Sequence, residues 1–501
     1  MGVKASLSKP FANFIALKNK LWSKRPVETQ QKVFEQLIAT AQKTAFGKDH
    51  NFKDIKSYED FKRLVPIRSY EDLQEYTDRV IAGEANILWP GKPLYLSKTS
   101  GTTSGTKYIP LTKASMPNHI NGARDAILHY IAETGKTQFV DHKMIFLQGS
   151  PDLDSSGAIP TGRLSGIVAH YVPNYLQKNR MPSQKTNAIA DWEKKLDAIC
   201  KETLSEKMSL ISGIPPWVQM YFERLIALSG KKDIKSIFPE FSLLIYGGVN
   251  YEPYRSSMEK LIGKRIDTIE LYTASEGFIA FQDSQKEEGM LLLLNSGIFY
   301  EFIPADQFFD ENPPRLSIEE VEIGINYAII LSTNAGLWAY NIGDTVKFVN
   351  KSPYRIVVSG RIKHFTSAFG EHIIVEEVEK AMAYACKTTK IEVAEFHLAP
   401  QVSPPEGKLP YHEWFIEFAT NKPDLTTFQQ ALDKKMQELN PYYKDLIQGK
   451  VLQPLKINSI VKGGFQAYMK SKGKLGGQNK LPRLANDRRL AEALEEIKEN
   501  N

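Results

Sequence analysis

The chain has 501 residues, of which 42% are hydrophobic and 24% are charged, and its net charge is +6. This composition excludes a disordered or fibrous protein, and the length predicts about two to four structural units. So small a net charge does not indicate nucleic-acid binding, and no apolar run is long enough to cross a membrane. Cys200 and Cys386 are too few for a disulfide framework and indicate a reducing, cytoplasmic setting. We therefore expect neither nucleic acid nor a membrane among the partners.

The first ninety residues predict mainly helices. Apolar residues recur at helical spacing in residues 29–44, and Pro66 and Pro90 interrupt the pattern. An earlier segment predicts an amphipathic helix whose apolar residues pack on the body of the protein. These residues are Phe11, Phe14, Ile15, Leu17, Leu21 and Trp22.

A segment rich in hydroxyl side chains follows, Ser97-Lys-Thr-Ser-Gly-Thr-Thr-Ser-Gly-Thr-Lys107. Gly101 and Gly105 permit backbone angles that expose consecutive N–H groups, and the hydroxyls and lysines add donors for phosphate oxygens. The spacing is not that of a P-loop, because Gly105 is followed by Thr106 and Lys107, and this argues against a kinase or ATPase core. Composition alone leaves a solvated loop as the alternative.

Strands and helices then alternate, which predicts α/β layers with both faces of the sheet covered. Residues 186–229 predict helices interrupted at residues 212–216. The predicted strands are residues 143–148, 241–246, 266–272, 290–294, 298–303, 327–332, 344–349 and 354–358.

A separate pattern begins after Ser359-Gly360-Arg361. Helices are predicted at residues 372–388 and 425–439, and strands at residues 391–397, 413–419 and 457–461. We therefore predict a large N-terminal domain of residues 1–360 and a small C-terminal α+β domain of residues 361–501. The junction would be a compact hinge near Arg361–Lys363.

Three later segments carry groups suited to a nucleotide. Tyr272-Thr-Ala-Ser-Glu276 follows a predicted strand, and ligands bind at the carboxyl ends of strands in open α/β sheets. Tyr340-Asn-Ile-Gly-Asp344 contains a Gly-Asp turn that could aim a carboxylate at a ribose diol. Lys474-Leu-Gly-Gly-Gln-Asn-Lys480-Leu-Pro-Arg483 places a lysine after a glycine turn.

Each segment also has a purely structural interpretation. Tyr272 and Tyr340 could be core aromatics, Asp344 a turn cap, Glu276 the partner of a surface lysine, and Lys480 a solvated side chain. The order and the content of the segments together favour the functional interpretation.

Thr99-Ser-Gly-Thr-Thr-Ser-Gly105, Tyr272–Glu276 and Tyr340–Asp344 together resemble the three nucleotide motifs of the adenylate-forming superfamily. Within it the chain is most similar to the Gretchen Hagen acyl acid amido synthetases, whose plant members conjugate auxin or jasmonate to amino acids. It resembles a shorter, prokaryotic-type member. The resemblance implies an α/β fold with a large N-terminal adenylate-forming domain of mixed sheets and helices, which binds ATP and the acyl acid. It also implies a small mobile α+β C-terminal domain that acts as a lid. Further similar stretches are Ile211-Ser-Gly-Ile-Pro-Pro216, Ile245-Tyr-Gly-Gly248, His412-Glu-Trp-Phe-Ile-Glu417 and Gln478-Asn-Lys-Leu-Pro-Arg483.

The resemblance also implies which residues hold the base and the phosphates of ATP. Tyr272 would stack on adenine, and Thr273 and Ser275 would contact the base edge or the α-phosphate. Gly247 and Gly248 would line the adenine slot, since only a backbone without side chains lets a flat base approach closely. The phosphate contacts would come from Ser100, Thr102, Thr103 and Ser104, with Lys107 nearby.

Five further residues receive roles from the resemblance. Glu276 would hold Mg²⁺, Asp344 would bind the ribose hydroxyls, and Arg361 would touch the ribose or a phosphate. Lys363 occupies the hinge position, and Lys480 would reach the α-phosphate from the small domain. Many relatives carry a lysine four residues after the hinge residue, where this chain has Ser367, and this weakens any transfer of acceptor chemistry from acyl-CoA ligases.

The implied activity has two steps, in which MgATP adenylates a carboxylic acid and an amine, that of an amino acid, then takes the acyl group. An acyl-CoA or aryl-CoA ligase with the same first step is the first alternative. The second alternative is a non-catalytic nucleotide-binding regulator. The acid, the amine, the general base of the second step and the oligomeric state stay open, and a monomer is compatible with the sequence.

Overall fold

The computed structural model describes residues 3–100, 106–148, 151–171, 178–189, 191–248, 251–362, 365–366, 373–402, 404, 409–420, 423–448, 452–473, 481–485 and 487–498. The chain forms two compact units. The first contains Met1–Gly248 and Arg265–Val358, and the second contains Val249–Lys264 and Ser359–Asn501. We predicted one boundary at residue 360, and this division also assigns residues 249–264 to the second unit.

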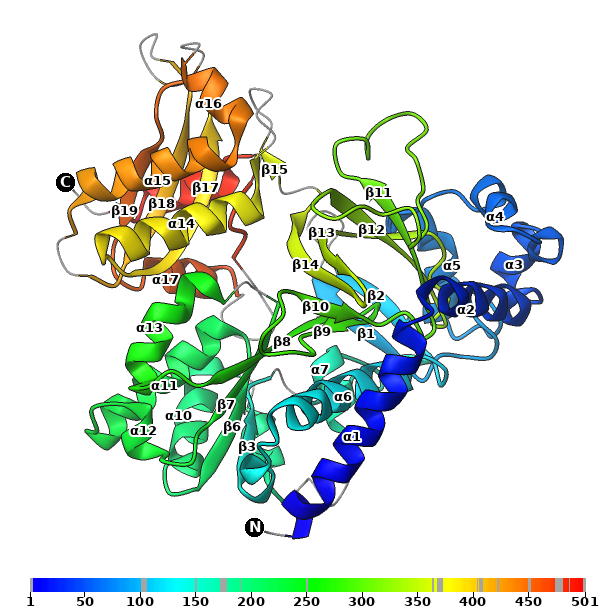
Figure 1. Ribbon diagram of the computed structural model, residues 1–501, viewed down its shortest axis with the longest axis horizontal. Helices are drawn as coiled ribbons and strands as arrows, with labels where there is room; N and C mark the ends of the chain where they lie inside the picture. The colour runs from blue at the N-terminus through cyan, green and yellow to red at the C-terminus, as the bar shows by residue number, and fades with distance from the viewer. Residues whose placement is uncertain are drawn as a thin grey trace. The chain divides into compact units, whose positions relative to one another are not determined.

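Helices form most of the N-terminal part of the first unit (Figure 1). Among the described residues no helix is long and apolar enough to span a bilayer. The helices are α1 (Val3–Ser23), α2 (Pro26–Ala41), α3 (Ala45–Asp49), α4 (Tyr58–Leu64), α5 (Gln74–Ile81) and α6 (Met116–Thr134), with 3₁₀ turns η1 (Phe52–Asp54), η2 (Glu71–Leu73) and η3 (Gln138–Asp141).

The predicted N-terminal helix exists, but a different face of it packs on the protein. Ala12, Ile15 and Asn19 are buried against α6, and Asn19 Nδ2 lies 3.0 Å from His129 Nε2. Of the apolar residues expected to pack, Phe11, Phe14, Leu17 and Leu21 are exposed. That expectation was wrong for these four side chains, because small and polar residues let α1 approach α6 closely.

An eleven-stranded mixed sheet is the centre of the first unit, in the order β11-β12-β13-β14-β10-β9-β8-β7-β6-β3-β5. The strands from β8 to β5 run parallel, and the pairs from β8 to β10 and from β11 to β13 are antiparallel. Their bounds are β3 (Lys143–Phe146), β5 (Arg180–Met181), β6 (Met208–Ser212), β7 (Leu243–Gly247), β8 (Asp267–Ala274), β9 (Gly277–Phe281), β10 (Met290–Leu292), β11 (Ile298–Pro304), β12 (Asn326–Thr333), β13 (Tyr340–Lys351) and β14 (Tyr354–Arg361).

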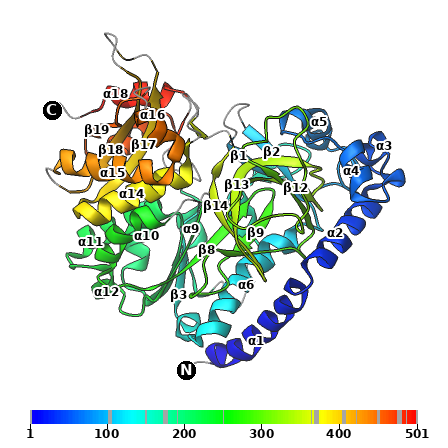
Figure 2. The same cartoon turned by 45° about the horizontal axis from the view of Figure 1, so that its top comes forward.

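Helices cover both faces of the parallel strands, as the alternating pattern predicted (Figures 1 and 2). Ala126, Tyr130 and Ile131 of α6 share a buried cluster with Leu243 of β7 and Ile269 of β8. The other face is covered by helices between β5 and β7. These helices are α9 (Gln184–Asn187), α10 (Trp192–Thr203), α11 (Pro215–Ser229) and α12 (Ile234–Ile237), and α7 (Leu164–Ala169) lies before β5 in the chain.

Two features of the first unit differ from the prediction. The stretch between the helices of residues 186–229 contains the buried strand β6, whose three apolar residues look the same in a helix or a strand. The hydroxyl-rich segment includes the end of strand β1 (Tyr95–Ser100) and the start of strand β2 (Thr106–Leu111), which pair antiparallel. Strand β4 (Thr161–Gly162) pairs with β1 and completes a three-stranded sheet.

The second unit is an α+β layer structure with the sheet order β17-β18-β19. Alternation along β18 sends Trp414 toward α14 and α15 and Phe415 toward α17 and α18. The predicted helix at residues 425–439 is confirmed. The elements are α13 (Glu252–Ile262), β15 (Phe365–Thr366), β16 (Ile373–Ile374), α14 (Val375–Thr389), β17 (Val393–Gln401), β18 (Tyr411–Phe418), α15 (Leu425–Leu439), α16 (Pro441–Gln448), β19 (Lys456–Ile460), α17 (Gly464–Ser471) and α18 (Arg489–Glu495).

Candidate active site

The carboxyl ends of β6, β7 and β8 lie at one edge of the sheet, because these strands run parallel. Gly247 ends β7, and a Cβ there would lie 2.4 Å from the backbone oxygen of Leu271 on β8. Gly248 has φ +81°, a conformation that favours glycine. Strand packing and turn geometry thus require both glycines, and their role at adenine stays a prediction.

Tyr272 and Asp344, from two different sequence motifs, are hydrogen-bonded to each other. Tyr272 Oη donates to Asp344 Oδ2 at 2.8 Å. Three strands separate β8 from β13 in the sheet, and four strand spacings of about 4.8 Å would place them about 19 Å apart on a flat sheet. Two side chains cannot span that distance, so the sheet must curl until β13 faces β8.

Asp344 lies in an irregular part of β13. Ala328 pairs with Thr345 and Ile330 pairs with Asn341, so one residue of β12 faces three residues of β13. Gly343 has φ +87° and donates its N–H to Asn341 Oδ1 at 2.8 Å. The Gly-Asp pair predicted as a turn is therefore a bulge within a strand, and bulges re-aim side chains beside binding sites.

The hydroxyl-rich segment meets the end of β8 at its base. Ser97 of β1 is fully buried, and its Oγ lies 2.9 Å from Oγ of Ser275. Ser100 ends β1 and pairs with Thr106. The half-buried Lys107 places its Nζ 5.5 Å from the ring centroid of Tyr70. Thr102, Thr103 and Ser104 and the Ser100 side chain lie outside the described residues.

The turn that holds Glu276 is clamped from α6. Ser275 and Glu276 connect β8 to β9, where Ala274 pairs with Gly277. Asn118 Nδ2 donates to the Phe278 backbone oxygen at 3.0 Å, and Asn118 Oδ1 accepts from the Phe278 N–H at 2.6 Å. Glu276 itself is only 9% exposed. A carboxylate is thus held at low exposure beside the hydroxyl-rich strands.

Two further predicted site residues lie at exposed positions of strands. Thr273 is exposed on β8, and Arg361 is exposed as the last residue of β14. Lys363, Ser367 and Lys480 lie outside the described residues. No group of three or more His, Cys, Asp and Glu suited to a metal occurs in the described ranges. Any Mg²⁺ at Glu276 would therefore take most of its ligands from phosphates and water, as Mg²⁺ commonly does.

Sequence reasoning missed Ser97 and Asn118 as residues that organise the site. Ser97 belongs to the hydroxyl-rich segment, but the sequence analysis gave it no role. Side chains two residues apart on a strand share a face, so Ser97 and Thr99 could have been placed on one face of the strand. Asn118 lies in a helix without any motif, and its contact with Phe278 joins residues 160 positions apart.

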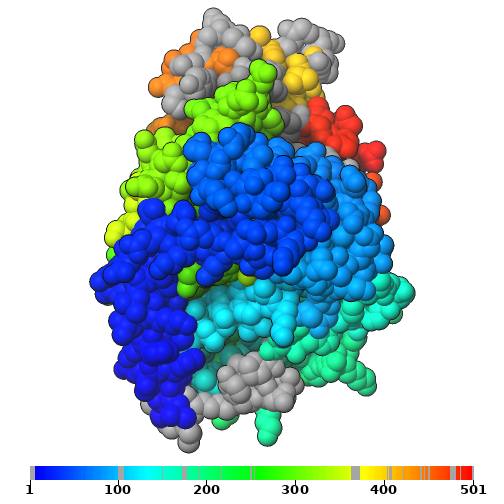
Figure 3. Space-filling view, turned by 90° about the vertical axis from the view of Figure 1, so that its right-hand side faces the viewer, coloured from blue at the N-terminus to red at the C-terminus, as the bar shows by residue number. Residues whose placement is uncertain are grey.

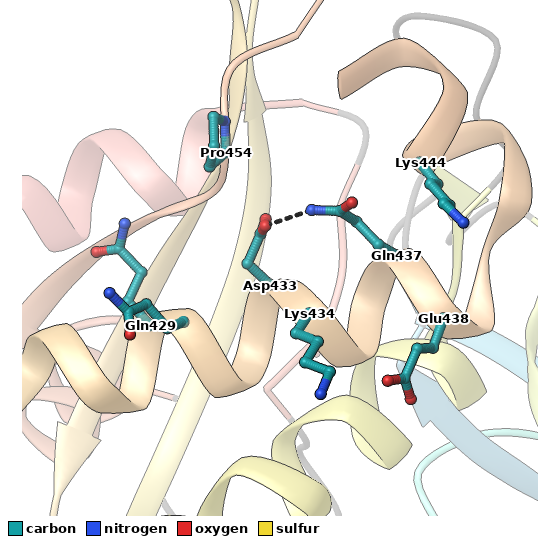
Figure 4. Close-up of a pocket in the computed structure, with 8 residues that line it drawn as sticks. Gln429, Asp433, Lys434, Gln437, Glu438, Lys444 and Pro454 are labelled. Carbon is teal, nitrogen blue, oxygen red and sulfur yellow. Dashed lines mark hydrogen bonds between the residues drawn. The ribbon is translucent and has the colours of Figure 1, made fainter. Parts of the chain in front are cut away.

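A surface groove of about 450 Å³ in the second unit contains none of the predicted site residues (Figure 4). Asp433 at its base accepts hydrogen bonds from Tyr443 Oη at 2.7 Å and Gln437 Nε2 at 2.7 Å, so its carboxylate serves the fold. The lining residues are Gln429, Gln430, Asp433, Lys434, Gln437, Glu438, Lys444 and Pro454.

Three family models match the chain in order. They are the GH3 family N-terminal domain over residues 18–191, the central domain over residues 291–361 and the C-terminal domain over residues 376–489. The solved structure of the GH3.15 acyl acid amido synthetase superposes with a TM-score of 0.77 at 16% identity, covering 95% of this chain and 94% of that one. A 2-hydroxyisobutyryl-CoA ligase in the postadenylation state gives a TM-score of 0.62 at 13% identity, covering 93% and 90%. These likenesses confirm the predicted fold class.

The relatives with similar sequences include plant proteins. The jasmonoyl–L-amino acid synthetase GH3.5 of Oryza sativa subsp. japonica is 22% identical, over 85% of this chain and 87% of that protein. The indole-3-acetic acid-amido synthetase GH3.3 of Arabidopsis thaliana is 21% identical, over 93% and 90%. The chain belongs to the GH3 family, the Gretchen Hagen family that its motifs resemble.

Proposed function

We propose that this protein is an acyl acid amido synthetase, which adenylates a carboxylic acid with ATP and passes the acyl group to the amine of an amino acid. The observation that carries the proposal is the meeting of separate motifs at one sheet edge. The Tyr272–Asp344 hydrogen bond joins two of the motifs, and the Ser97–Ser275 contact joins the hydroxyl-rich strands to one of them. Family membership and the names of the relatives supply the reaction class.

In the first step, a carboxylate oxygen of the acid attacks the α-phosphorus of ATP, and the bond from that phosphorus to pyrophosphate breaks. Both reactants are anions, so the site must place donors and cations where charge develops. The hydroxyl-rich segment and Lys107 supply donors for phosphate oxygens, and Asp344 accepts from the ribose hydroxyls. Lys480 is assigned to the α-phosphate by the sequence motif alone.

Magnesium fits Glu276 as a carboxylate ligand, since this side chain has low exposure and follows Ser275, which contacts Ser97 of the hydroxyl-rich strands. When bound, Mg²⁺ would neutralise phosphate charge and orient the leaving pyrophosphate. The role of the protein is to hold the Glu276 carboxylate in place, and Asn118 does so through the Phe278 backbone.

In the second step, a neutral amine attacks the acyl carbon of the mixed anhydride, which forms the amide bond and releases AMP. The amine must lose a proton in this step. We propose rotation of the small domain about the predicted hinge at Lys363 as the event that opens a path for the amine.

The test is pyrophosphate release from MgATP across a panel of carboxylic acids, each with amino acids, with CoA, or with neither, and with products identified by mass. Acid-dependent release that yields an amide supports the proposal. A thioester alone would instead support an acyl-CoA ligase, the activity named for one structural neighbour. ATP binding without release for any acid would contradict catalysis and favour a nucleotide-binding regulator.

A further inference from the structure

The outer side of α1 carries a line of apolar side chains that nothing in the first unit covers. Fifteen large hydrophobic side chains are exposed among the described residues, and six of these lie within residues 7–27. Five of the six belong to α1 and are between 46% and 68% exposed. We name these five the outer stripe: Leu7, Phe11, Phe14, Leu17 and Leu21.

The outer stripe is continuous along the helix. Leu7, Phe14 and Leu21 recur every seven residues, so they lie on one line, and Phe11 and Leu17 flank it. The fourteen helical steps from Leu7 to Leu21 span about 21 Å. Figure 3 shows the N-terminal segment as a ridge along one edge of the first unit. A continuous exposed apolar surface of this kind marks an interaction site more often than chance exposure.

The charged residues of the segment that carries the stripe have one sign. Residues 3–25 contain no Asp or Glu. In the described part of the helix, Lys9, Lys18 and Lys20 are exposed, and Lys24 and Arg25 are exposed just beyond its end. Arg25 lies 3.8 Å from Glu28, and solvent screens this ion pair because both side chains are exposed. The stripe therefore needs a partner that is apolar at its centre and anionic beside it.

We propose that α1 docks this protein on an anionic phospholipid surface. Phe and Leu side chains enter the boundary of the acyl chains, and lysine stems extend their ammonium groups to the lipid phosphates. A second copy of the chain would set the same cations against one another, and the stripe carries no hydrogen-bonding side chain to fix a protein partner. The helix would lie in the interface without crossing it. This proposal departs from our expectation that no membrane takes part, and the experiment below decides between them.

The test is co-sedimentation of the full chain with vesicles of phosphatidylcholine alone and with added phosphatidylglycerol. We expect binding to the anionic vesicles that weakens as salt is raised. The double variant Phe11→Ser, Phe14→Ser should lower the partition coefficient at least about tenfold, because two phenyl groups no longer enter the lipid. Both side chains are exposed, so unchanged circular dichroism and melting are expected.

Phe309→Ser is the matched control, because Phe309 is 63% exposed on another part of the first unit. This variant should bind vesicles like the unmodified protein. Equal loss in both variants would overturn the proposal, as would no binding of the unmodified chain to anionic vesicles at low salt. A concentration-dependent dimer that F11S/F14S abolishes, without vesicle binding, would assign the stripe to a second copy and overturn the proposal as well.

Discussion

The two ends of strand β8 carry the same pair of side chains, yet sequence motifs occur at only one end. At the amino end, Tyr130 Oη donates to Asp267 Oδ2 at 2.6 Å, and Lys136 pairs with the same carboxylate. At the carboxyl end, Tyr272 Oη donates to Asp344 Oδ2 at 2.8 Å.

The difference lies in what surrounds each pair. Asp267 links helix α6 to the start of strand β8. Its side chain is 30% exposed, and its partner Lys136 is 54% exposed. Asp344 lies in a bulge, across the curled sheet from Tyr272, and Ser275, three residues after Tyr272, contacts the hydroxyl-rich strands. A tyrosine–aspartate hydrogen bond alone therefore does not identify a site. The position of the Tyr272–Asp344 pair at the carboxyl ends of parallel strands is what supports the proposed site.

The largest expected effect is that of Glu276→Gln, which removes the charge proposed to hold Mg²⁺. Acid-dependent pyrophosphate release at saturating MgATP should fall about 10²–10³-fold, the usual loss for one electrostatic group. Glu133→Gln is the matched control. Glu133 accepts hydrogen bonds from Ser284 Oγ and the Gln285 N–H near the amino end of β8, and this variant should keep its rate. Equal rates of pyrophosphate release for the two variants would contradict a special role for the carboxyl end of β8.

Helix α6 contributes a side chain to each end of β8, and these two should differ in their contribution to stability. Asn118→Ala leaves the buried Phe278 N–H and carbonyl without their partner, and the free energy of unfolding should fall by about 2–4 kcal/mol. Tyr130→Phe removes one partly buried hydrogen bond and should lower the free energy of unfolding by about 1 kcal/mol. Denaturant unfolding measures both. An Asn118→Ala protein as stable as the unmodified one would show that the turn needs no clamp.

Double-mutant cycles at the two ends sharpen the comparison further. Tyr272→Phe and Asp344→Asn should be coupled by about 1 kcal/mol in the KM for ATP, a factor of about five, because the two side chains are bonded where the ribose is proposed to bind. Tyr130→Phe and Asp267→Asn should be coupled in unfolding free energy and leave that KM unchanged. Coupling of the amino-end pair in KM would contradict the assignment of the site.

The smallest effect is a pH dependence at the amino end. Burial raises the pKa of Asp267, but hydrogen bonds from Lys136 and Tyr130 outweigh it, so the pKa lies below its ordinary value of 3.8. The carboxylate therefore adds stability above pH 3.8, and this contribution is lost as pH falls through the lower folded-state pKa. Its partner is exposed, so we expect less than about 1 kcal/mol. Urea unfolding between neutral pH and pH 3 should show a shallower decline for Asp267→Asn, and an unchanged slope would refute the ion pair's contribution.

Local patterns predicted much of the fold and the order of the motifs. The strand that leads into Tyr272 and the helix at residues 425–439 follow from short-range periodicity. Asp344 reaches Tyr272 only because the whole sheet curls, and a short stretch of sequence carries no information about that curl. The Asn118 clamp depends on a contact with a residue 160 positions away. For α1, periodicity predicted an apolar face, but which face packs was set by Ala12 and Asn19 against α6.

The most direct test of the central claim is equilibrium binding of a non-hydrolysable ATP analogue with Mg²⁺, measured by calorimetry on the unmodified chain, Asp344→Asn and Asp267→Asn. The account predicts that Asp344→Asn weakens binding about tenfold to a hundredfold, as expected for loss of one hydrogen bond to a charged group, while Asp267→Asn binds like the unmodified chain. Unchanged binding in Asp344→Asn, or equal weakening in both variants, would contradict a nucleotide site at the carboxyl end of β8.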